Sequence, residues 1–138
     1  MTNYKTVFFI LGVLQIILGL SMIVPILAQF FYNQIDSGFV SSGIITVVFG
    51  VLFFLSNLDH NKKLSLPQAF LLTALSWLSI AIFGSLPFVF SNIELSFTDA
   101  FFESMSGITT TGSTIITNLN ETPKAILLWR AMLQWLGG

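Results

Sequence analysis

The sequence has no cysteine, one histidine and few charged residues, and each shortage excludes a class of protein. Without cysteine there are no disulfides, no thiolate nucleophiles and no cysteine-ligated metals, while the redox compartment stays undetermined. The single histidine, His60, follows Asp59 in a polar loop, and we interpret it as a solvated side chain rather than a metal ligand. Positive charge clusters only at Lys62 and Lys63, which is too small a patch for binding nucleic acid. No nucleic-acid partner is expected.

Apolar residues dominate what is present. Hydrophobic side chains occupy 54% of the 138 positions and charged ones 8%, more apolar surface than a water-soluble domain of this size could bury. Three apolar runs are long enough to cross a hydrocarbon layer that needs about 20 helical residues. They extend over Val7–Phe31, Gly38–Leu58 and Leu66–Phe90. The predicted fold class is therefore all-α, with several transmembrane helices in a lipid bilayer.

Proline and glycine predict how these helices bend and pack. Pro25 is expected to bend the first span, because proline lacks an N–H and its ring crowds the preceding turn. Gly12 and Gly19 would let a neighbouring helix approach that span closely. Gly43 and Gly50 lie seven residues apart on one face of the second span.

The distribution of lysine predicts the orientation. Lys5 precedes the first span, and Lys62 and Lys63 follow the second, whereas the loop Asn33–Ser37 carries only Asp36. Positive charge near the ends of membrane helices favours the cytoplasmic side. The amino terminus is therefore predicted to face the cytoplasm.

Acidic residues follow the third span, on the predicted outer side. Glu94, Asp99 and Glu103 would raise the local concentration of cations at an entrance. Asp99 is equally compatible with a solvated position on a helix face. Glu103 lies deeper, and a buried charge in hydrocarbon requires a partner, for which Arg130 is a candidate.

The segment Phe97–Gly107 is too short to span the membrane, since about 11 helical residues reach only about 16 Å. We expect a half-helix that enters the membrane and returns to the same side. Ser96 and Asp99 resemble a capping box at its start, and its carboxyl end at Gly107 would direct partial negative charge at the residues that follow. An apolar stripe along it consists of Phe97, Phe101 and Met105.

The sequence Thr109-Thr110-Thr111-Gly112-Ser113 follows this half-helix directly. Glycine adopts backbone angles that other residues resist, and an extended segment from Thr109 to Gly112 would offer successive carbonyl oxygens to a dehydrated cation. By itself the string is also typical of an ordinary external turn. The order of full span, capped half-helix, Thr-Gly loop and further apolar helix favours a pore loop.

The last apolar segment, Lys124–Gly138, is too short to cross a bilayer, since about 15 helical residues reach about 22 Å. We interpret it as the beginning of a fourth membrane helix. One filter loop cannot close a ring around an ion, so a pore would need further loops of the same kind.

The residues Phe97–Ser113, with Leu128-Trp129-Arg130 and Gln134–Gly138, resemble the Trk/Ktr family of potassium transporters, and within it the TrkH-type membrane subunits. The resemblance implies four consecutive repeats of helix, pore helix, filter and helix around a pseudo-fourfold pore, of which this chain would hold the first. Residues 1–60 would be the extra amino-terminal helix pair of TrkH-type proteins. Residues 61–138 would be the first repeat, incomplete in its last helix.

The resemblance also implies a site and a function. Potassium would be bound by the backbone carbonyls of Thr110, Thr111 and Gly112, with Thr109 at the inner end, during uptake across the cell inner (plasma) membrane. No enzymatic reaction and no organic cofactor is expected. The implied partners are the lipid bilayer, the remaining repeats, a second copy in a homodimer and a cytoplasmic nucleotide-binding regulatory subunit. The filter lacks the TVGYG sequence of potassium channels, which implies a less strict selectivity over sodium.

Two other functions stay open from the sequence alone. One is a small subunit that forms a cation channel as a homotetramer. The other is a non-conducting membrane anchor or assembly module, in which the Thr-Gly loop is an external turn. Three further pore-loop repeats downstream of Gly138 would favour the transporter, and a stop codon soon after Gly138 would favour the homotetramer.

Overall fold

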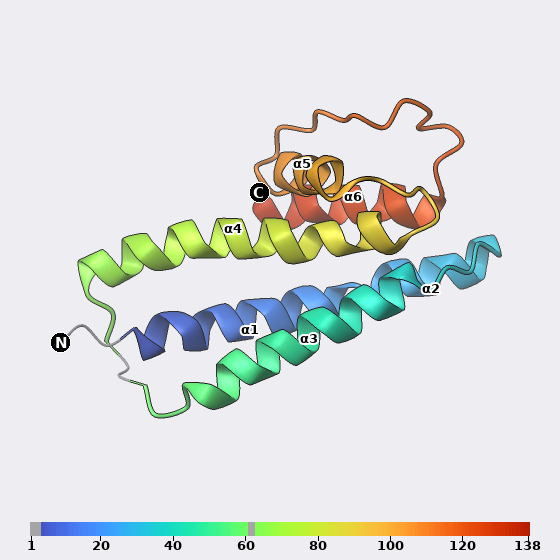
Figure 1. The fold of residues 1–138 in the computed structure, drawn as a ribbon. Helices are drawn as coiled ribbons and strands as arrows, with labels where there is room; N and C mark the ends of the chain where they lie inside the picture. Colours follow the sequence, from blue (N-terminus) through green and yellow to red (C-terminus); the bar gives the residue numbers. More distant parts are fainter. Residues whose placement is uncertain (1–3, 61–62) are drawn as a thin grey trace.

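A computed structural model describes residues 4–60 and 63–138, so Lys62, used above for the orientation, lies outside the described residues. All regular secondary structure in this part of the chain is helical, which confirms the predicted fold class. The helices are α1 (Lys5–Ser21), α2 (Ile23–Tyr32), α3 (Gly38–Ser56), α4 (Leu66–Phe90), α5 (Phe97–Ile108) and α6 (Lys124–Gly137), as shown in Figure 1.

Three helical stretches are long and apolar enough to cross a membrane, and they match the three predicted spans. The first, Lys5–Tyr32, comprises α1 and α2 together. The third has the predicted bounds, Leu66–Phe90, and the second ends at Ser56, two residues before the predicted Leu58. Apolar length therefore located the spans correctly.

The predicted bend in the first span is a break between α1 and α2 at Met22. Pro25 lies three residues further on, and its ring crowds the carbonyl of Ser21, four residues before it. The hydroxyl of Ser21 also donates to the carbonyl of Leu18 at 2.6 Å, a local bond of the kind that bends helices. The proline thus interrupts the helix one turn before its own position.

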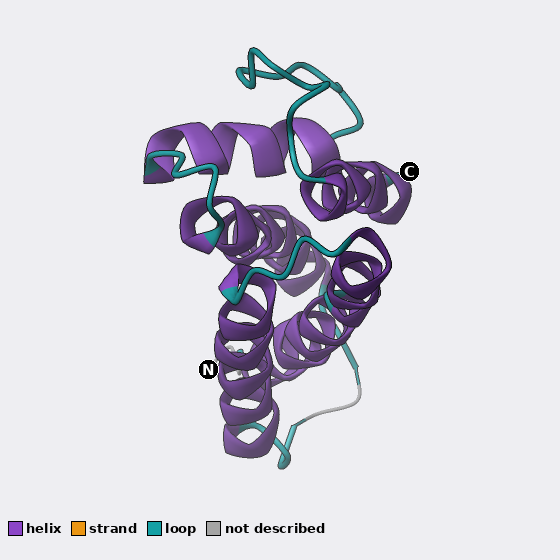
Figure 2. Cartoon of the chain, turned by 90° about the vertical axis from the view of Figure 1, so that its right-hand side faces the viewer, coloured by secondary structure: helices purple, strands orange, loops and turns teal. Residues whose placement is uncertain are grey.

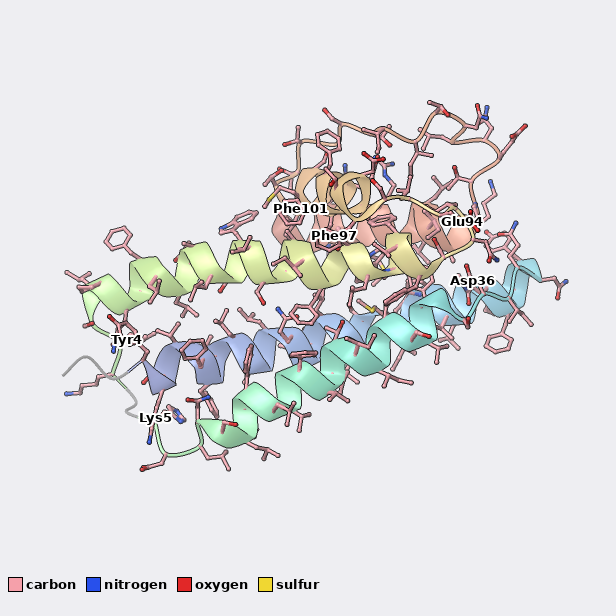
Figure 3. The ribbon with its side chains drawn as sticks, viewed as in Figure 1. Tyr4, Lys5, Asp36, Glu94, Phe97 and Phe101 are labelled. Carbon is pink, nitrogen blue, oxygen red and sulfur yellow. The ribbon has the colours of Figure 1, made fainter. Side chains whose placement is uncertain are left out.

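The long helices lie side by side and define two ends of the molecule. α4 lies between the α1–α3 pair and the layer formed by α5 and α6 (Figures 1 and 2). Tyr4 lies at one end, where the ring of Phe9 stacks on that of His60 with 3.9 Å between centroids. Asp36 and Glu94 lie at the opposite end, called here the Asp36 end (Figure 3).

Glycine allows backbone contact between α1 and α3, as predicted. A Cβ atom added to Gly12 would lie 2.6 Å from the backbone nitrogen of Phe54, and one added to Gly50 would lie 2.8 Å from that of Ile16. Real Cβ atoms do not approach other atoms so closely, so both positions require glycine. Gly43 has more room, with its nearest neighbour at 3.5 Å.

The core joins the amino-terminal helices to the rest of the chain. Trp129 of α6 is fully buried, and its indole N–H donates to the carbonyl of Gly84 in α4 at 2.9 Å. The ring of Phe39 in α3 meets the Trp129 ring edge-on, with centroids 6.2 Å apart. The buried hydrophobic cluster consists of Leu18, Met22, Phe39, Phe88, Ala100, Ala125, Ile126, Trp129 and Leu133.

Candidate functional site

The half-helix α5 lies across the long helices. It is seen end-on in Figure 1, where the long helices run across the view, and from the side in Figure 2. Its predicted start is confirmed, since the hydroxyl oxygen of Ser96 accepts the N–H of Asp99 at 3.2 Å. It ends at Ile108, one residue later than predicted. The chain then returns to the Asp36 end, where α6 begins at Lys124 (Figure 1). The segment therefore re-enters the bundle, as expected for a pore loop.

The buried face of α5 is its small and polar face. Ser104 is fully buried, and a Cβ atom added to Gly84 of α4 would lie 2.7 Å from its hydroxyl oxygen. The predicted apolar stripe does not enter this core, since Phe97 is 54% exposed and Phe101 and Met105 are half-buried (Figure 3). Small side chains let α5 lie close to α4 and α6. Within the described residues, the phenylalanines of α5 therefore lie outside this contact.

Glu103 of α5 is buried and fully hydrogen-bonded. One carboxylate oxygen accepts the N–H of Ile115 at 2.7 Å and the hydroxyl of Thr114. The other accepts the Nε–H of Arg130 in α6 at 2.9 Å, which confirms the predicted pair. These partners satisfy a charge that would otherwise be expensive to bury. Glu103 therefore joins α5, the segment after the filter sequence and α6.

The first residues of the predicted filter close α5 instead of running extended. Thr110 has a left-handed backbone, with φ 60°, and its N–H donates to the carbonyl of Gly107 at 2.9 Å. The N–H of Thr111 donates to the carbonyl of Ser106 at 3.0 Å. These two bonds form a Schellman motif, which satisfies the last carbonyls of a helix. The predicted extended backbone is therefore wrong for Thr110, and also for Thr109, which has φ −79° and ψ 0°.

This motif turns the N–H groups towards α5 and leaves the carbonyls free. The N–H of Gly112, which has φ 78°, also points to the carbonyl of Ser106, at 3.2 Å. The Ser106 hydroxyl donates to the carbonyl of Ser113 at 2.6 Å, which holds the far end of the loop. Within the described part of the chain, no group donates a hydrogen bond to the carbonyl oxygens of residues 109–112. Unengaged carbonyl oxygens are what a dehydrated cation requires.

The structure brings the four predicted site residues together at the carboxyl end of α5. Thr109, Thr110 and Thr111 are exposed and Gly112 is half-buried. Gly112 faces α6, because a Cβ atom added to it would lie 3.0 Å from Nε2 of Gln134. Sequence reasoning missed the supporting contacts made by residues that have no distinctive spacing. They lie in α5, in the segment after Gly112 and in α6: Ser106, Thr114, Ile115 and Gln134.

A family model described as "TrkH: Cation transport protein" matches residues 35–138. The chain belongs to this family. Its members are transport proteins and not enzymes, in agreement with the sequence-based expectation. A Trk system potassium uptake protein TrkH from Halomonas elongata is 45% identical over 131 residues, covering 94% of this chain and 27% of the relative. An uncharacterized cation transporter from Methanocaldococcus jannaschii is 38% identical over 128 residues, which cover 92% of this chain and 26% of the relative.

The fold is similar to that of a solved structure. The crystal structure of the potassium transporter TrkH from Vibrio parahaemolyticus matches with a TM-score of 0.94 at 36% identity. The match covers 99% of this chain and 30% of the solved chain. The chain thus spans less than a third of the length of the relatives it matches.

Proposed function

We propose that this chain is the part of a potassium uptake transporter that contributes one filter loop to the pore. The single observation that carries the proposal is that the carbonyl oxygens of residues 109–112, at the end of a capped half-helix packed on α4 and α6, accept no hydrogen bond from the described residues. Relatives named as potassium uptake proteins support potassium as the ion.

In this proposal the carbonyls of Thr110, Thr111 and Gly112, with Thr109 at the inner end, replace part of the water shell of potassium. The carboxyl end of α5 adds partial negative charge beside them. Residues 1–60 form the amino-terminal helix pair, and residues 61–138 form the first repeat. The other repeats of the full-length protein supply the remaining carbonyls of the ring. The transported ion is the only ligand, and no organic cofactor takes part.

The proposed location is the cell inner membrane, with the amino terminus in the cytoplasm. Lys5 is exposed at the end opposite Asp36 (Figure 3), and Lys63 is exposed in the α3–α4 loop, which supports this orientation. Glu94 is exposed at the Asp36 end, where it would attract cations to the entrance. Family resemblance supports a homodimer and a cytoplasmic nucleotide-binding regulatory subunit for the full-length protein.

The homotetramer and the membrane anchor are not favoured. The relatives that match over nearly the whole of this chain are named as potassium uptake proteins. These relatives are also more than three times as long as this chain, since it covers 27–29% of their length. A pore made from several repeats in one polypeptide agrees with that length.

The test is Gly112→Ser in the full-length protein. A side chain at φ 78° strains the backbone by about 1–3 kcal/mol, so the loop should shift its carbonyls and the preference for potassium over sodium should fall. Uptake of both ions and membrane abundance are measured in cells lacking other potassium uptake. Ser113→Ala is the matched control, because the Ser113 contact uses its backbone carbonyl. An unchanged ion preference in Gly112→Ser would remove the filter assignment.

A further inference from the structure

The re-entrant segment is attached to the bundle at two places at the Asp36 end. It leaves α4 through Asn92 and rejoins the bundle at Lys124, the first residue of α6. Both attachment points contact one short segment, residues 34–38, which consists of the end of the α2–α3 loop and the first residue of α3. We call residues 34–38 the clasp.

Two hydrogen bonds join the clasp to the two attachment points. Oδ2 of Asp36 accepts the backbone N–H of Asn92 at 2.8 Å, across 56 positions of sequence. Oε1 of Gln34 accepts the backbone N–H of Lys124 at 3.0 Å, across 90 positions. Lys124 is the first residue of α6, where the backbone N–H has no partner within the helix, and Asn92 follows the carboxyl end of α4. Side chains of the amino-terminal helix pair thus satisfy backbone groups on both sides of the re-entrant segment.

The clasp has a hydrogen bond of its own and is in close contact with α4. Oδ1 of Asp36 accepts the N–H of Gly38 at 2.9 Å, which fixes the carboxylate in a local turn. A Cβ atom added to Gly38 would lie 2.8 Å from the carbonyl carbon of Phe90 and 2.9 Å from the nitrogen of Ser91. The clasp therefore meets the end of α4 backbone to backbone, next to Asn92.

A displacement at either attachment point would reach the filter through stiff elements. α6 continues from Lys124 to Arg130, which binds Glu103, and to Gln134, which lies beside Gly112. On the other side, Asn92 precedes the short link to the Ser96 cap of α5. Since a helix transmits a shift of one end along its length, the clasp sets the position of both supports of the filter.

We propose that Asp36 and Gln34 are positioning residues for the filter, through which the amino-terminal helix pair fixes the two ends of the re-entrant segment. This inference rests on the proposed transport function. The clasp does not touch the transported ion, and it acts through Asn92 and Lys124.

The first test is Asp36→Ala and Gln34→Ala, singly and together, in the full-length protein. Each change leaves a backbone N–H without its acceptor, so the maximal rate of potassium uptake and the preference over sodium should each fall several-fold, most in the double variant. Asp36→Asn keeps one acceptor oxygen and should give an intermediate loss. Ser37→Ala is the matched control in the same loop, because the Ser37 side chain is exposed and makes no capping bond.

Uptake and ion preference equal to those of Ser37→Ala in the double variant would overturn the positioning role. If the unaltered full-length protein took up no potassium, the proposed function itself would fail. These two failures are separate, because the first requires an active parent protein.

A cross-link tests the clasp independently of any loss of folding. Asp36→Cys and Asn92→Cys are combined in a full-length protein otherwise free of cysteine and are joined with a short linker that reacts with two thiols, because the Asp36 carboxylate lies 2.8 Å from the backbone nitrogen of Asn92. Without the linker, uptake and ion preference should fall to the level of Asp36→Ala, and the linker should restore them. Absence of the cross-link, or a cross-linked protein as impaired as Asp36→Ala, would overturn the inference.

Discussion

The side chain of Glu103 accepts three hydrogen bonds while only 1% of the residue is exposed. Its partners lie in two other parts of the chain, the segment that follows the filter and helix α6. A buried carboxylate with incomplete bonding would be strongly destabilising, so the three partners act as a unit. A single charged residue thus determines where the loop after Gly112 runs.

Glu103→Gln should lower the free energy of unfolding by about 3 kcal/mol, because it replaces the buried carboxylate with an amide and leaves the half-buried Arg130 guanidinium without its counter-charge. Denaturant unfolding of the detergent-solubilised full-length protein measures the loss. Arg130→Gln and the double variant complete a cycle, and the two losses should not add, since the residues are in contact. Glu121→Gln, at an exposed position, should change stability by less than about 0.5 kcal/mol. Additive losses would show that the pair is not coupled.

Helices α1 and α3 pack by direct backbone contact at Gly12 and Gly50. Lipid tails are as apolar as the side chains, so association inside a membrane depends on close packing rather than on the hydrophobic effect. The helix pair is therefore sensitive to added volume at these two glycines and less sensitive at Gly43, which has ordinary contact distances.

Gly12→Leu should destabilise the full-length protein by about 1–3 kcal/mol, because the side chain would meet the backbone of α3. Thermal unfolding in detergent and abundance in the membrane both measure this effect. Gly43→Ala is the matched control and should change either quantity little. Equal effects of the two substitutions would contradict the packing of α1 on α3 described here.

The molecule as a whole has two chemically different ends. Ile35 is 75% exposed at the Asp36 end, and Lys63 is exposed in the α3–α4 loop. Positive charge at the end opposite Asp36 predicts that this end faces the cytoplasm. This orientation would direct the opening of the re-entrant segment to the outside, as uptake requires.

The orientation is tested with Ile35→Cys and Lys63→Cys in a full-length protein otherwise free of cysteine. A membrane-impermeant thiol reagent applied to intact cells should label the first variant and not the second. Permeabilised cells provide the control, in which both positions should react. Labelling of Lys63→Cys alone on intact cells would reverse the topology.

The sequence by itself determined the three spans and the capped half-helix, and it indicated Arg130 as a candidate partner of Glu103. Spans and caps depend on local properties, since apolar length, Pro25 and the Ser96–Asp99 spacing act within a few turns. The ion pair was accessible for another reason: a charge within an apolar segment needs a partner, and few candidates existed.

Tertiary structure alone decided how these parts meet. It placed the polar face of α5 against α4 and α6, although the apolar stripe of this helix indicated the opposite face. The curl of Thr109 and Thr110 around the end of α5 is a local feature, because the carbonyls of Ser106 and Gly107 needed donors, but the sequence did not indicate it, since threonine rarely adopts the left-handed backbone of Thr110. The bonds of Asp36 and Gln34 join residues 56 and 90 positions apart, so they depend on the path of whole helices, which no local pattern specifies.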